Sequence, residues 1–420
     1  MTTKDDPMDV IDLAQRLIRT PSPVRDGDER AVADVVQAAL AEAGLPRASV
    51  LALHSDRPNL HLTVEFGQGG HHLALVGHID TKPVGDARWT VDPFGAETDG
   101  ERLYGLGSAD MKGAVAAMIV AAGRLVADPP ARGRLTLVFT ADEEDGAVYG
   151  ARYLATALPL DADALVIGEP GGIHDDYDGL HLVSRGLARF TLTARARQGH
   201  SSLSALLGLR NAGVDLARAI ADLPAIDVSV PDNDDGLRDW SATVNPGLDV
   251  WGGYGYGVLA EQMAASVEVR TLPGMDDDRL LSELRARVDQ TASATGADLS
   301  LDYDDSARRW IGGTRVRADD PLVAAVRAAT EHVLGIAPPL SVFPGTTDTS
   351  WFAEADPSLP CLPALGPGLL RHAHGADEWV SVDAVRAAVD LYDVLARDFC
   401  SSPQTSAGAR VGETVRGGAR

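Results

Sequence analysis

The sequence has little cysteine and no long apolar run, and each absence excludes a class of protein. Cys361 and Cys400 are the two cysteines in 420 residues. This excludes a disulfide scaffold or a cysteine-based zinc knuckle and favours a reducing compartment. The most apolar run, residues 113–123, is too short to span a bilayer. The first residues carry no apolar stretch behind a positive charge, so no secretory signal is predicted. We therefore expect a cytoplasmic protein.

Positive charge is also scarce. The 37 basic residues are outnumbered by 61 acidic ones, which gives a formal net charge of −24. A chain this negative repels phosphate backbones and anionic lipids, so we predict neither a nucleic-acid partner nor a membrane surface. Lysine occurs only at Lys4, Lys82 and Lys112. With 45% hydrophobic and 23% charged residues, the composition is that of a globular protein, and the length suits two domains.

Short apolar runs alternate with helical segments in the first part of the chain. This alternation is typical of an α/β sheet with parallel strand pairs. The runs lack polar alternation, which indicates strands that are covered on both faces. We predict strands at residues 72–77, 135–140 and 164–167 and helices at 9–18, 29–43, 111–126 and 150–157.

The pattern changes at about residue 187. Strands predicted at 187–196, 242–250, 264–270 and 299–303 enclose helices at 209–223 and 276–294. The resulting order βαββαβ is that of a ferredoxin-like unit. Beyond it, a helix at 322–334 and an apolar stretch at 360–365 return to the first pattern.

We therefore predict an α/β protein whose catalytic domain has a mixed, mostly parallel sheet and is interrupted by a ferredoxin-like insertion. The catalytic domain would comprise residues 1–185 and 305–400, and the insertion residues 186–304. Residues 401–420 are rich in Ser, Gly, Arg and Thr without apolar period, and we expect them to be a disordered tail.

Polar side chains follow the three predicted strands of the first part. His78 and Asp80 follow the first strand, Glu143 and Glu144 the second, and Glu169 the third. Ligand sites in open α/β sheets lie beyond the carboxyl ends of the strands. We therefore expect these side chains to meet at one edge of the sheet.

Two further residues are candidates for the same place. Asp110 opens a predicted helix, and His374 follows a Gly-Pro-Gly turn. Taken singly, each candidate has an ordinary explanation, such as a helix N-cap for Asp110 or an exposed histidine for His374. Their convergence favours a site instead, because clustered carboxylates repel one another unless a cation lies among them.

Charge and ligand type indicate two divalent cations. Asp110, Glu144 and Glu169 would contribute three negative charges, and His78 and His374 would be neutral ligands. Imidazole nitrogen and carboxylate oxygen without thiolate suit zinc or a similar ion rather than calcium. One carboxylate would then bridge the pair, as in co-catalytic centres.

Two neighbouring acids would support this centre. Asp80 is placed to hold the far ring nitrogen of His78. Glu143, beside a ligand, is free to accept a proton from water.

The motifs around these residues resemble the dinuclear zinc amidohydrolase and metallopeptidase family of acetylornithine deacetylase and succinyl-diaminopimelate desuccinylase. The resemblance covers about residues 10–397 and is carried by motifs in a fixed order. They are Gly77-His78-Ile79-Asp80-Thr81, Arg88-Trp89-Thr90-Val91-Asp92-Pro93-Phe94, Leu103-Tyr104-Gly105-Leu106-Gly107-Ser108-Ala109-Asp110-Met111-Lys112-Gly113, Ala141-Asp142-Glu143-Glu144, Ile167-Gly168-Glu169-Pro170, Gly199-His200-Ser201-Ser202, Arg270-Thr271-Leu272-Pro273-Gly274-Met275 and Leu365-Gly366-Pro367-Gly368, with His374 and Asp377-Glu378 following.

The resemblance implies roles for the candidate residues. His78, Asp110 and Glu169 would hold one metal and Asp110, Glu144 and His374 the other, with Asp80 orienting His78 and Glu143 as general base. It further implies that the insertion is a lid and dimerisation domain of a homodimer. His200 would reach the partner's active site, and Arg270 and Asn245 would contact the substrate carboxylate.

The predicted function is hydrolysis of the amide of an N-acyl amino acid with two divalent metal ions, zinc or alternatively cobalt. Three motifs are nearest to acetylornithine deacetylase, which favours an N-acetyl substrate. The segment Gly345-Thr346-Thr347-Asp348 departs from that branch and is more similar to desuccinylases and broad peptidases. Succinyl-diaminopimelate desuccinylase, a dipeptidase or carboxypeptidase, and a non-catalytic metal-binding protein remain alternatives.

Overall fold

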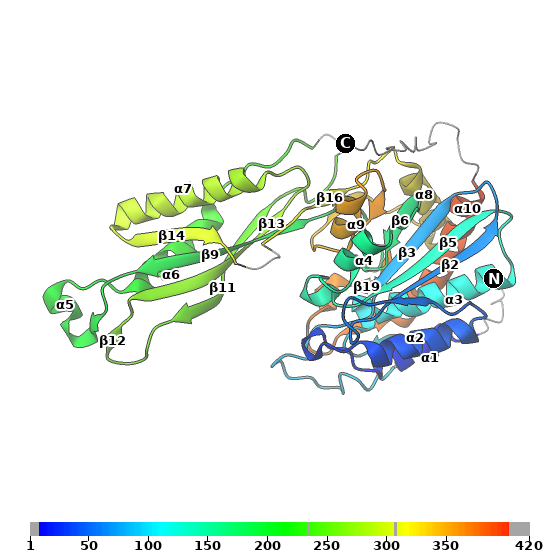
Figure 1. Cartoon of the computed structure of the whole chain (residues 1–420), viewed down its shortest axis with the longest axis horizontal. Coiled ribbons are helices and arrows are strands. Elements are labelled where there is room, and N and C mark those ends of the chain that lie inside the picture. The colour runs from blue at the N-terminus through cyan, green and yellow to red at the C-terminus, as the bar shows by residue number, and fades with distance from the viewer. Residues whose placement is uncertain (1–7, 234–235, 306–308, 403–420) are drawn as a thin grey trace, which may run out of the picture.

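The computed structural model describes residues 8–233, 236–305 and 309–402. These residues form a larger unit, on the right in Figure 1, and an elongated smaller unit beside it. Each has its own cluster of buried apolar side chains. Most of the predicted tail lies outside the described residues, although Ser401 is still the last residue of a helix. Within the described ranges, no helix is both long and apolar enough to cross a bilayer.

A six-stranded mixed sheet forms the centre of the larger unit. Its order is β1-β2-β5-β3-β6-β18. The pairs β3–β5, β3–β6 and β6–β18 are parallel, while β1–β2 and β2–β5 are antiparallel. The prediction of a mixed, mostly parallel α/β sheet is thus confirmed. The strand bounds are β1 Ser49–Leu51, β2 Asn59–Gly67, β3 His72–His78, β5 Gly133–Thr140, β6 Ala164–Ile167 and β18 Cys361–Leu362.

Helices bury the apolar strands of this sheet. All seven residues of β3 are buried, because helices α3 (Gly113–Ala127) and α10 (Val382–Ser401) pack on each other and against this strand. Helix α1 (Val10–Ile18) packs on both, and α8 (Pro321–Leu334) packs on α10. The other helices of this unit are α2 (Arg30–Glu42), α4 (Ala151–Ala157) and α9 (Thr349–Ala355).

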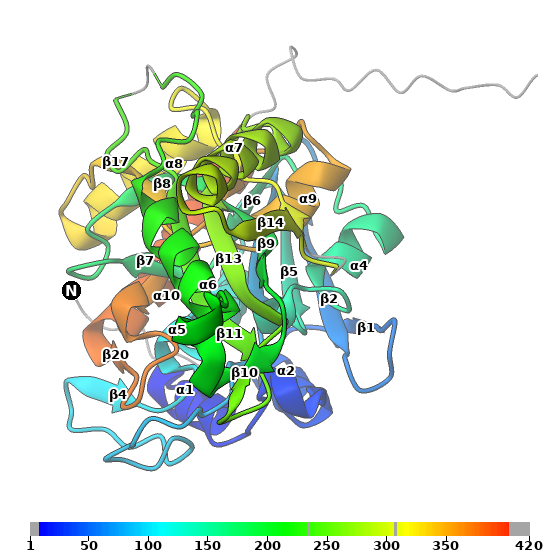
Figure 2. The ribbon, with the colours of Figure 1, turned by 90° about the vertical axis from the view of Figure 1, so that its left-hand side faces the viewer.

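The smaller unit is an antiparallel sheet with two long helices. Its strand order is β11-β13-β9-β14, with the short β15 also paired to β9. Helices α6 and α7 contact each other and lie side by side in Figure 2. The bounds are β9 Gly186–Arg195, α6 Ala212–Asp222, β11 Thr243–Gly252, β13 Gln262–Thr271, α7 Asp277–Thr295, β14 Asp298–Tyr303 and β15 Trp310–Ile311.

Several elements differ from the expectation. The helix expected at 111–126 begins at Gly113, because residues Ser108–Lys112 form a wide turn that includes Asp110. The apolar stretch at 360–365 contributes only the two residues of β18 before β19 (Gly366–Leu369). A three-stranded sheet not anticipated from the sequence, β16-β8-β17, lies where the chain leaves and re-enters the larger unit. Its strands are β8 Leu180–Ser184, β16 Thr314–Arg315 and β17 Leu340–Phe343.

Replacement of Leu75 by alanine tests the placement of β3 in the core. Leu75 has no exposed surface, so Leu75→Ala should lower the free energy of unfolding by about 2–5 kcal/mol. Leu53→Ala is the matched control, because Leu53 is 57% exposed, and its effect should stay within about 0.5 kcal/mol. Urea denaturation followed by circular dichroism measures both. Equal effects of the two substitutions would contradict this assignment.

Candidate metal centre

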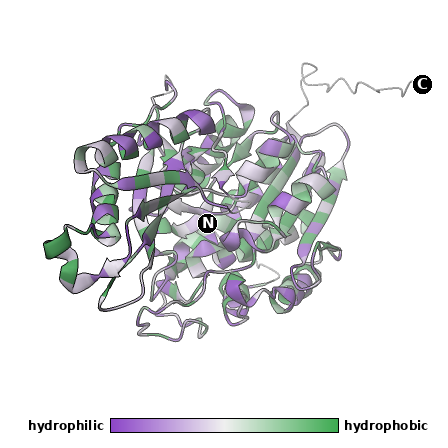
Figure 3. Cartoon of the chain, turned by 60° about the vertical axis from the view of Figure 1, so that its left-hand side comes forward, coloured by the Kyte–Doolittle hydropathy of each residue, from purple (hydrophilic) through white to green (hydrophobic). Residues whose placement is uncertain are grey.

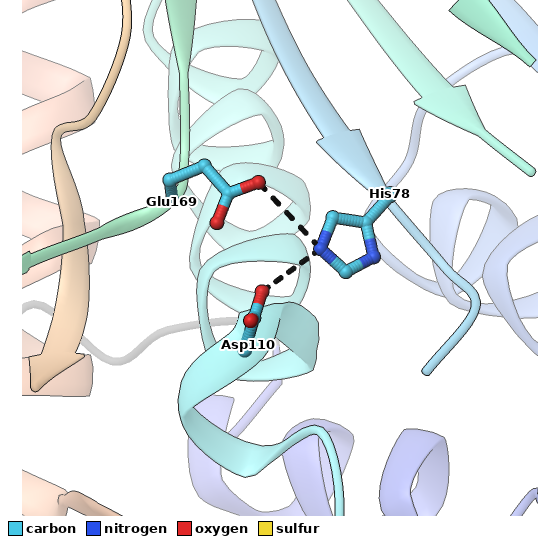
Figure 4. A group of neighbouring side chains, drawn as sticks. All are labelled: His78, Asp110 and Glu169. Carbon is cyan, nitrogen blue, oxygen red and sulfur yellow. Dashed lines mark hydrogen bonds and ion pairs between the residues drawn. The ribbon is translucent and has the colours of Figure 1, made fainter. Parts of the chain in front are cut away.

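One group of potential metal ligands lies at the carboxyl ends of β3 and β6. His78 ends β3, Glu169 follows β6, and Asp110 comes from the turn before α3. The His78 Nε2 atom lies 2.9 Å from Asp110 Oδ1 and 3.7 Å from Glu169 Oε1 (Figure 4). All three side chains are buried, and their ligand atoms lie within 4.8 Å of one another. This first triad can hold one metal ion.

A second triad shares Asp110 with the first. His374 Nε2 lies 3.2 Å from Asp110 Oδ2 and 3.2 Å from Glu144 Oε2. Asp110 therefore directs one oxygen to each triad. The His374 side chain is 48% exposed, whereas that of Glu144 is 5% exposed. The nitrogen and oxygen donors, and the shared carboxylate, fit a pair of divalent ions.

The sheet explains how distant residues meet. Strands β3, β5 and β6 are adjacent and parallel in register, so their carboxyl ends lie at one edge. The Ile79 N–H donates to the Thr140 carbonyl at 2.9 Å, which keeps the ends of β3 and β5 level. The turn that presents Asp110 is fixed by buried Lys112, whose Nζ donates to the carbonyls of Leu17 and Thr20.

Asp80 contacts His78 differently from the expectation. The Nδ1 atom of His78 lies 3.0 Å from the backbone carbonyl of Asp80 and 3.7 Å from its carboxylate. That carboxylate instead accepts the N–H groups of Glu143 and Glu144, at 3.2 and 3.0 Å. The physical reason is that the turn after β5 presents two orphan N–H groups to the fully buried acid. Asp80 thus fixes the Glu143–Glu144 turn as well as the His78 ring.

Burial, together with the crowding of acids, raises the pKa values of two carboxyl groups in the centre. Burial raises the pKa of Glu143 well above its usual value, and the nearby charges of Asp348, Glu144 and Asp80 add to the effect despite His78. Burial and then Asp110 likewise raise the pKa of Glu169. Since these groups resist carrying negative charge together, the centre would gain from bound cations.

The same acids also raise the pKa values of the two imidazoles, although burial opposes this shift. Burial opposes a charge on His78, but its hydrogen bond with Asp110 and the charges of Glu169 and Asp110 outweigh it and raise the pKa of His78. Burial also opposes a charge on His374, and hydrogen bonds with Asp110 and Glu144 raise its pKa to about 10. The two imidazoles can therefore supply positive charge that stabilises the surrounding carboxylates. Bound metal ions would supply this charge in their place.

A cleft of about 480 Å³ opens beside the two triads and is walled by both units of the chain. From the larger unit it is lined by the acids and by Lys82, Phe343 and Thr346. From the smaller unit come Arg189, Glu268 and Arg270. The Arg270 guanidinium pairs with Glu268 at 2.8 Å and reaches Thr346 Oγ1 at 3.3 Å, which joins the two walls.

Comparison with known proteins agrees with this geometry. The sequence pattern described as "Peptidase family M20/M25/M40" matches residues 74–398. The chain belongs to this family. The resemblance inferred from the motifs is therefore confirmed, and the protein is a metal-dependent hydrolase that acts on amide bonds.

Three M20 relatives illustrate the range of the family. Succinyl-diaminopimelate desuccinylase of Methylocella silvestris is 31% identical over 395 residues, which are 92% of this chain and 97% of the relative. Acetylornithine deacetylase of Edwardsiella ictaluri is 29% identical over 407 residues, 93% of this chain and 97% of the relative. The M20 family metallo-carboxypeptidase of Sulfolobus solfataricus has a TM-score of 0.74 at 18% identity, covering 93% of this chain and 99% of that one.

Two of the residues predicted to contact substrate do not line the cleft of this M20 chain. His200 is exposed in the smaller unit, where its Nδ1 accepts from the Ser202 N–H at 3.3 Å. Asn245 lies on β11, opposite Glu268 of β13. Neither is among the residues that line the cleft, so their roles toward substrate stay predictions. Arg270, in contrast, lines it.

Sequence reasoning missed other residues of the cleft. The Nζ atom of Lys82 lies 3.0 Å from Glu144 Oε2. The available signal in the sequence was that Lys82, one of only three lysines, lies beside the His78-x-Asp80 motif. Arg189 gave no local signal, because it joins the site through its register with Glu268 on the neighbouring strand. Asp348 does not line the cleft but follows Thr347, which does. It is buried and accepts from Thr140 Oγ1 at 2.9 Å, and the only signal for it in the sequence was the departure of its segment from the deacetylase branch.

Because Asp110 is shared by both triads, its removal should lower the metal content more than removal of His374. Asp110→Ala should abolish stoichiometric metal binding, because both triads lose an oxygen, whereas His374→Ala should reduce the content from about two ions to about one. Elemental analysis after dialysis against zinc measures this. His372→Ala is the control, since His372 lies in the same loop but in neither triad. An unchanged metal content in Asp110→Ala would contradict the shared centre.

Proposed function

We propose that this M20 enzyme removes an N-succinyl group, or a similar dicarboxylic acyl group, from an amino acid. The sequence alone favoured an N-acetyl substrate, but the desuccinylase alternative is better supported. Besides the relative from Methylocella silvestris, several further curated relatives carry the desuccinylase name. The observation that carries the proposal is the set of cationic side chains that line the cleft beside the triads: Lys82, Arg189 and Arg270.

The charge balance of the cleft supports an anionic substrate. Three cationic side chains, Lys82, Arg189 and Arg270, face five acids in its lining. Two divalent ions would turn this excess of negative charge into an excess of two positive charges. N-succinyl-diaminopimelate, with three carboxylates and one ammonium group at neutral pH, would neutralise that excess. N-acetylornithine carries one charge of each sign and would leave it uncompensated.

The residues of the chain have defined roles in the proposed hydrolysis. Bound metal ions would supply a water of lowered pKa and polarise the amide carbonyl. Five side chains would hold them: His78, Asp110, Glu144, Glu169 and His374. Zinc best suits these donors, and cobalt is the alternative. Glu143, which lines the cleft, accepts the proton of the attacking water and passes it to the leaving nitrogen. The products are a free amine and a carboxylate.

The smaller unit is proposed to be the ferredoxin-like insertion at residues 186–304, serving as lid and dimerisation domain. Support comes from its strand order, from its two packed helices, and from exposed apolar side chains. Figure 3 shows hydrophobic colour at the tip formed by α5 (Ser204–Leu207). In a homodimer, exposed His200 could then stabilise the oxyanion in the partner's site. The exposed apolar residues include Leu206, Leu207, Leu248, Trp251, Tyr254 and Tyr256.

The state of the two cysteines is relevant to the cellular compartment in which the protein works. Cys361 and Cys400 are both free and buried. Free buried thiols suit a reducing compartment, so we retain the cytoplasm as the proposed location.

A substrate panel tests the acyl preference. The zinc-loaded enzyme should hydrolyse N-succinyl-diaminopimelate with a kcat/KM at least about 100-fold above that for N-acetylornithine. The reason is that only N-succinyl-diaminopimelate carries the net negative charge that complements the metal-loaded cleft. N-formyl amino acids and neutral dipeptides complete the panel. Preference for a dipeptide would favour the peptidase alternative, and preference for N-acetylornithine would restore the deacetylase interpretation.

A single substitution tests the proposed base. Glu143→Gln should lower kcat by about 10²–10⁴-fold while metal content is retained, because the amide cannot accept the proton. Glu65→Gln, at an exposed position of β2, is the matched control and should leave kcat unchanged. Initial rates and elemental analysis on the same samples measure both properties. Full activity of Glu143→Gln would remove this residue from the mechanism.

A further inference from the structure

The histidine of the second triad lies on a segment that the core does not hold. The His374 side chain is 48% exposed, whereas those of His78 and Glu169 in the first triad are 1% and 7% exposed. The backbone around it is strained, with φ of +62° at His374 and +57° at Asp377. Residues other than glycine adopt this left-handed region rarely. Other contacts must therefore fix the direction of the imidazole.

Asp377 supplies one set of such contacts. Its Oδ1 accepts the Thr90 N–H at 2.7 Å and the Val91 N–H at 3.3 Å, and its Oδ2 accepts from Thr90 Oγ1 at 2.8 Å. Thr90 and Val91 are 287 and 286 positions away in the sequence. A surface carboxylate thus ties the histidine segment to the loop that follows β3.

Glu378 supplies a second, buried set. Its Oε2 accepts the Gly107 N–H at 3.0 Å, and its Oε1 accepts the N–H groups of Ala109 and Asp110 at 2.9 and 3.1 Å. Its backbone carbonyl accepts the Gly105 N–H at 2.9 Å. Glu378 is 1% exposed and contacts the turn that presents the shared carboxylate. The following strand β20 (Trp379–Ser381) extends the connection by pairing with β4 (Arg102–Tyr104).

We propose that Asp377 and Glu378 are positioning residues that set the second metal position, by joining the segment of His374 to the segment of Asp110. Neither touches the reacting atoms. Asp377 acts on His374 alone, while Glu378 acts on both His374 and Asp110. Outer partners of this kind orient ligands and change metal affinity by about 10–100-fold when removed.

The hydrogen-bond pattern predicts which substitutions matter. In Glu378→Gln the new NH₂ group must face at least one backbone N–H, since all three partners of Glu378 are donors. In Asp377→Asn the NH₂ group can face Thr90 Oγ1, because a hydroxyl also accepts. Replacement by the isosteric amide should therefore weaken metal binding at position 378 and have little effect at position 377. At position 377, Asp377→Ala is the variant that removes the hydrogen bonds to Thr90 and Val91.

Metal titration of the full-length protein tests this proposal. Cobalt(II), followed by its visible absorption in competition with a chelator, yields the affinity of each position. Asp377→Ala should weaken the second position by about 10-fold or more and leave the first within about 2-fold. Asp377→Asn should behave as the native protein, and Glu378→Gln should weaken both positions because Asp110 is shared. Added metal should restore the kcat of Asp377→Ala without changing KM.

The matched control is Asp178→Ala. Asp178 accepts the backbone N–H groups of Ile173, His174 and Asp175, but its loop holds none of the five candidate ligands. Its removal should leave both affinities unchanged. Circular dichroism of every variant verifies folding, and if Asp377→Ala does not fold, Glu378→Gln and Asp377→Asn still decide the matter.

Three outcomes separate this proposal from the proposed function. If the native protein binds two ions and both Asp377→Ala and Glu378→Gln retain native affinities, the positioning role is wrong and the hydrolase centre stands. If Asp178→Ala weakens metal binding as much as Asp377→Ala does, the positioning role is also wrong, because loosening of any nearby loop would then have the same effect. If the native protein binds no metal, the centre itself is wrong.

Discussion

The structure depends on bringing several carboxylates together where water is scarce. Asp110, Glu144 and Glu169 are all buried within the two adjoining triads, and like charges this close together repel strongly in a medium of low polarity. Such a cluster persists only when positive charge is supplied. The imidazoles supply it in part, and divalent ions would supply the rest. The sheet, the wide turn before α3 and the carboxylate of Asp80 all serve to hold this unfavourable arrangement in place.

The sequence was most informative at the polar residues that come directly after buried strands. His78, Glu144 and Glu169 could be predicted to meet, because parallel strands end at a common edge and each strand was an unbroken apolar run. The strand β2 was not predicted, since its burial alternates and its residues are partly polar. The contact of the Asp80 carboxylate with two backbone N–H groups was also beyond prediction, because it depends on the path of a turn 63 residues away.

Residues that act across the cleft were harder to find. Arg189 and Glu268 are neighbours only through the pairing of β9 with β13, and that register is set by tertiary packing. Glu378 was visible as part of a motif, yet nothing in a linear pattern shows that its carboxylate contacts the turn of Asp110. Local patterns thus locate ligands well, whereas the partners that orient ligands emerge from the packing of segments far apart in the chain.

Asp110 offers a different oxygen to each triad, and this has a thermodynamic consequence. A carboxylate that rotates or shifts toward one ion changes the donor available to the other. Occupancy of the two positions is therefore linked, and the free energy of loading the pair is not the sum of two independent affinities. The first ion to bind would therefore change the affinity of the other position.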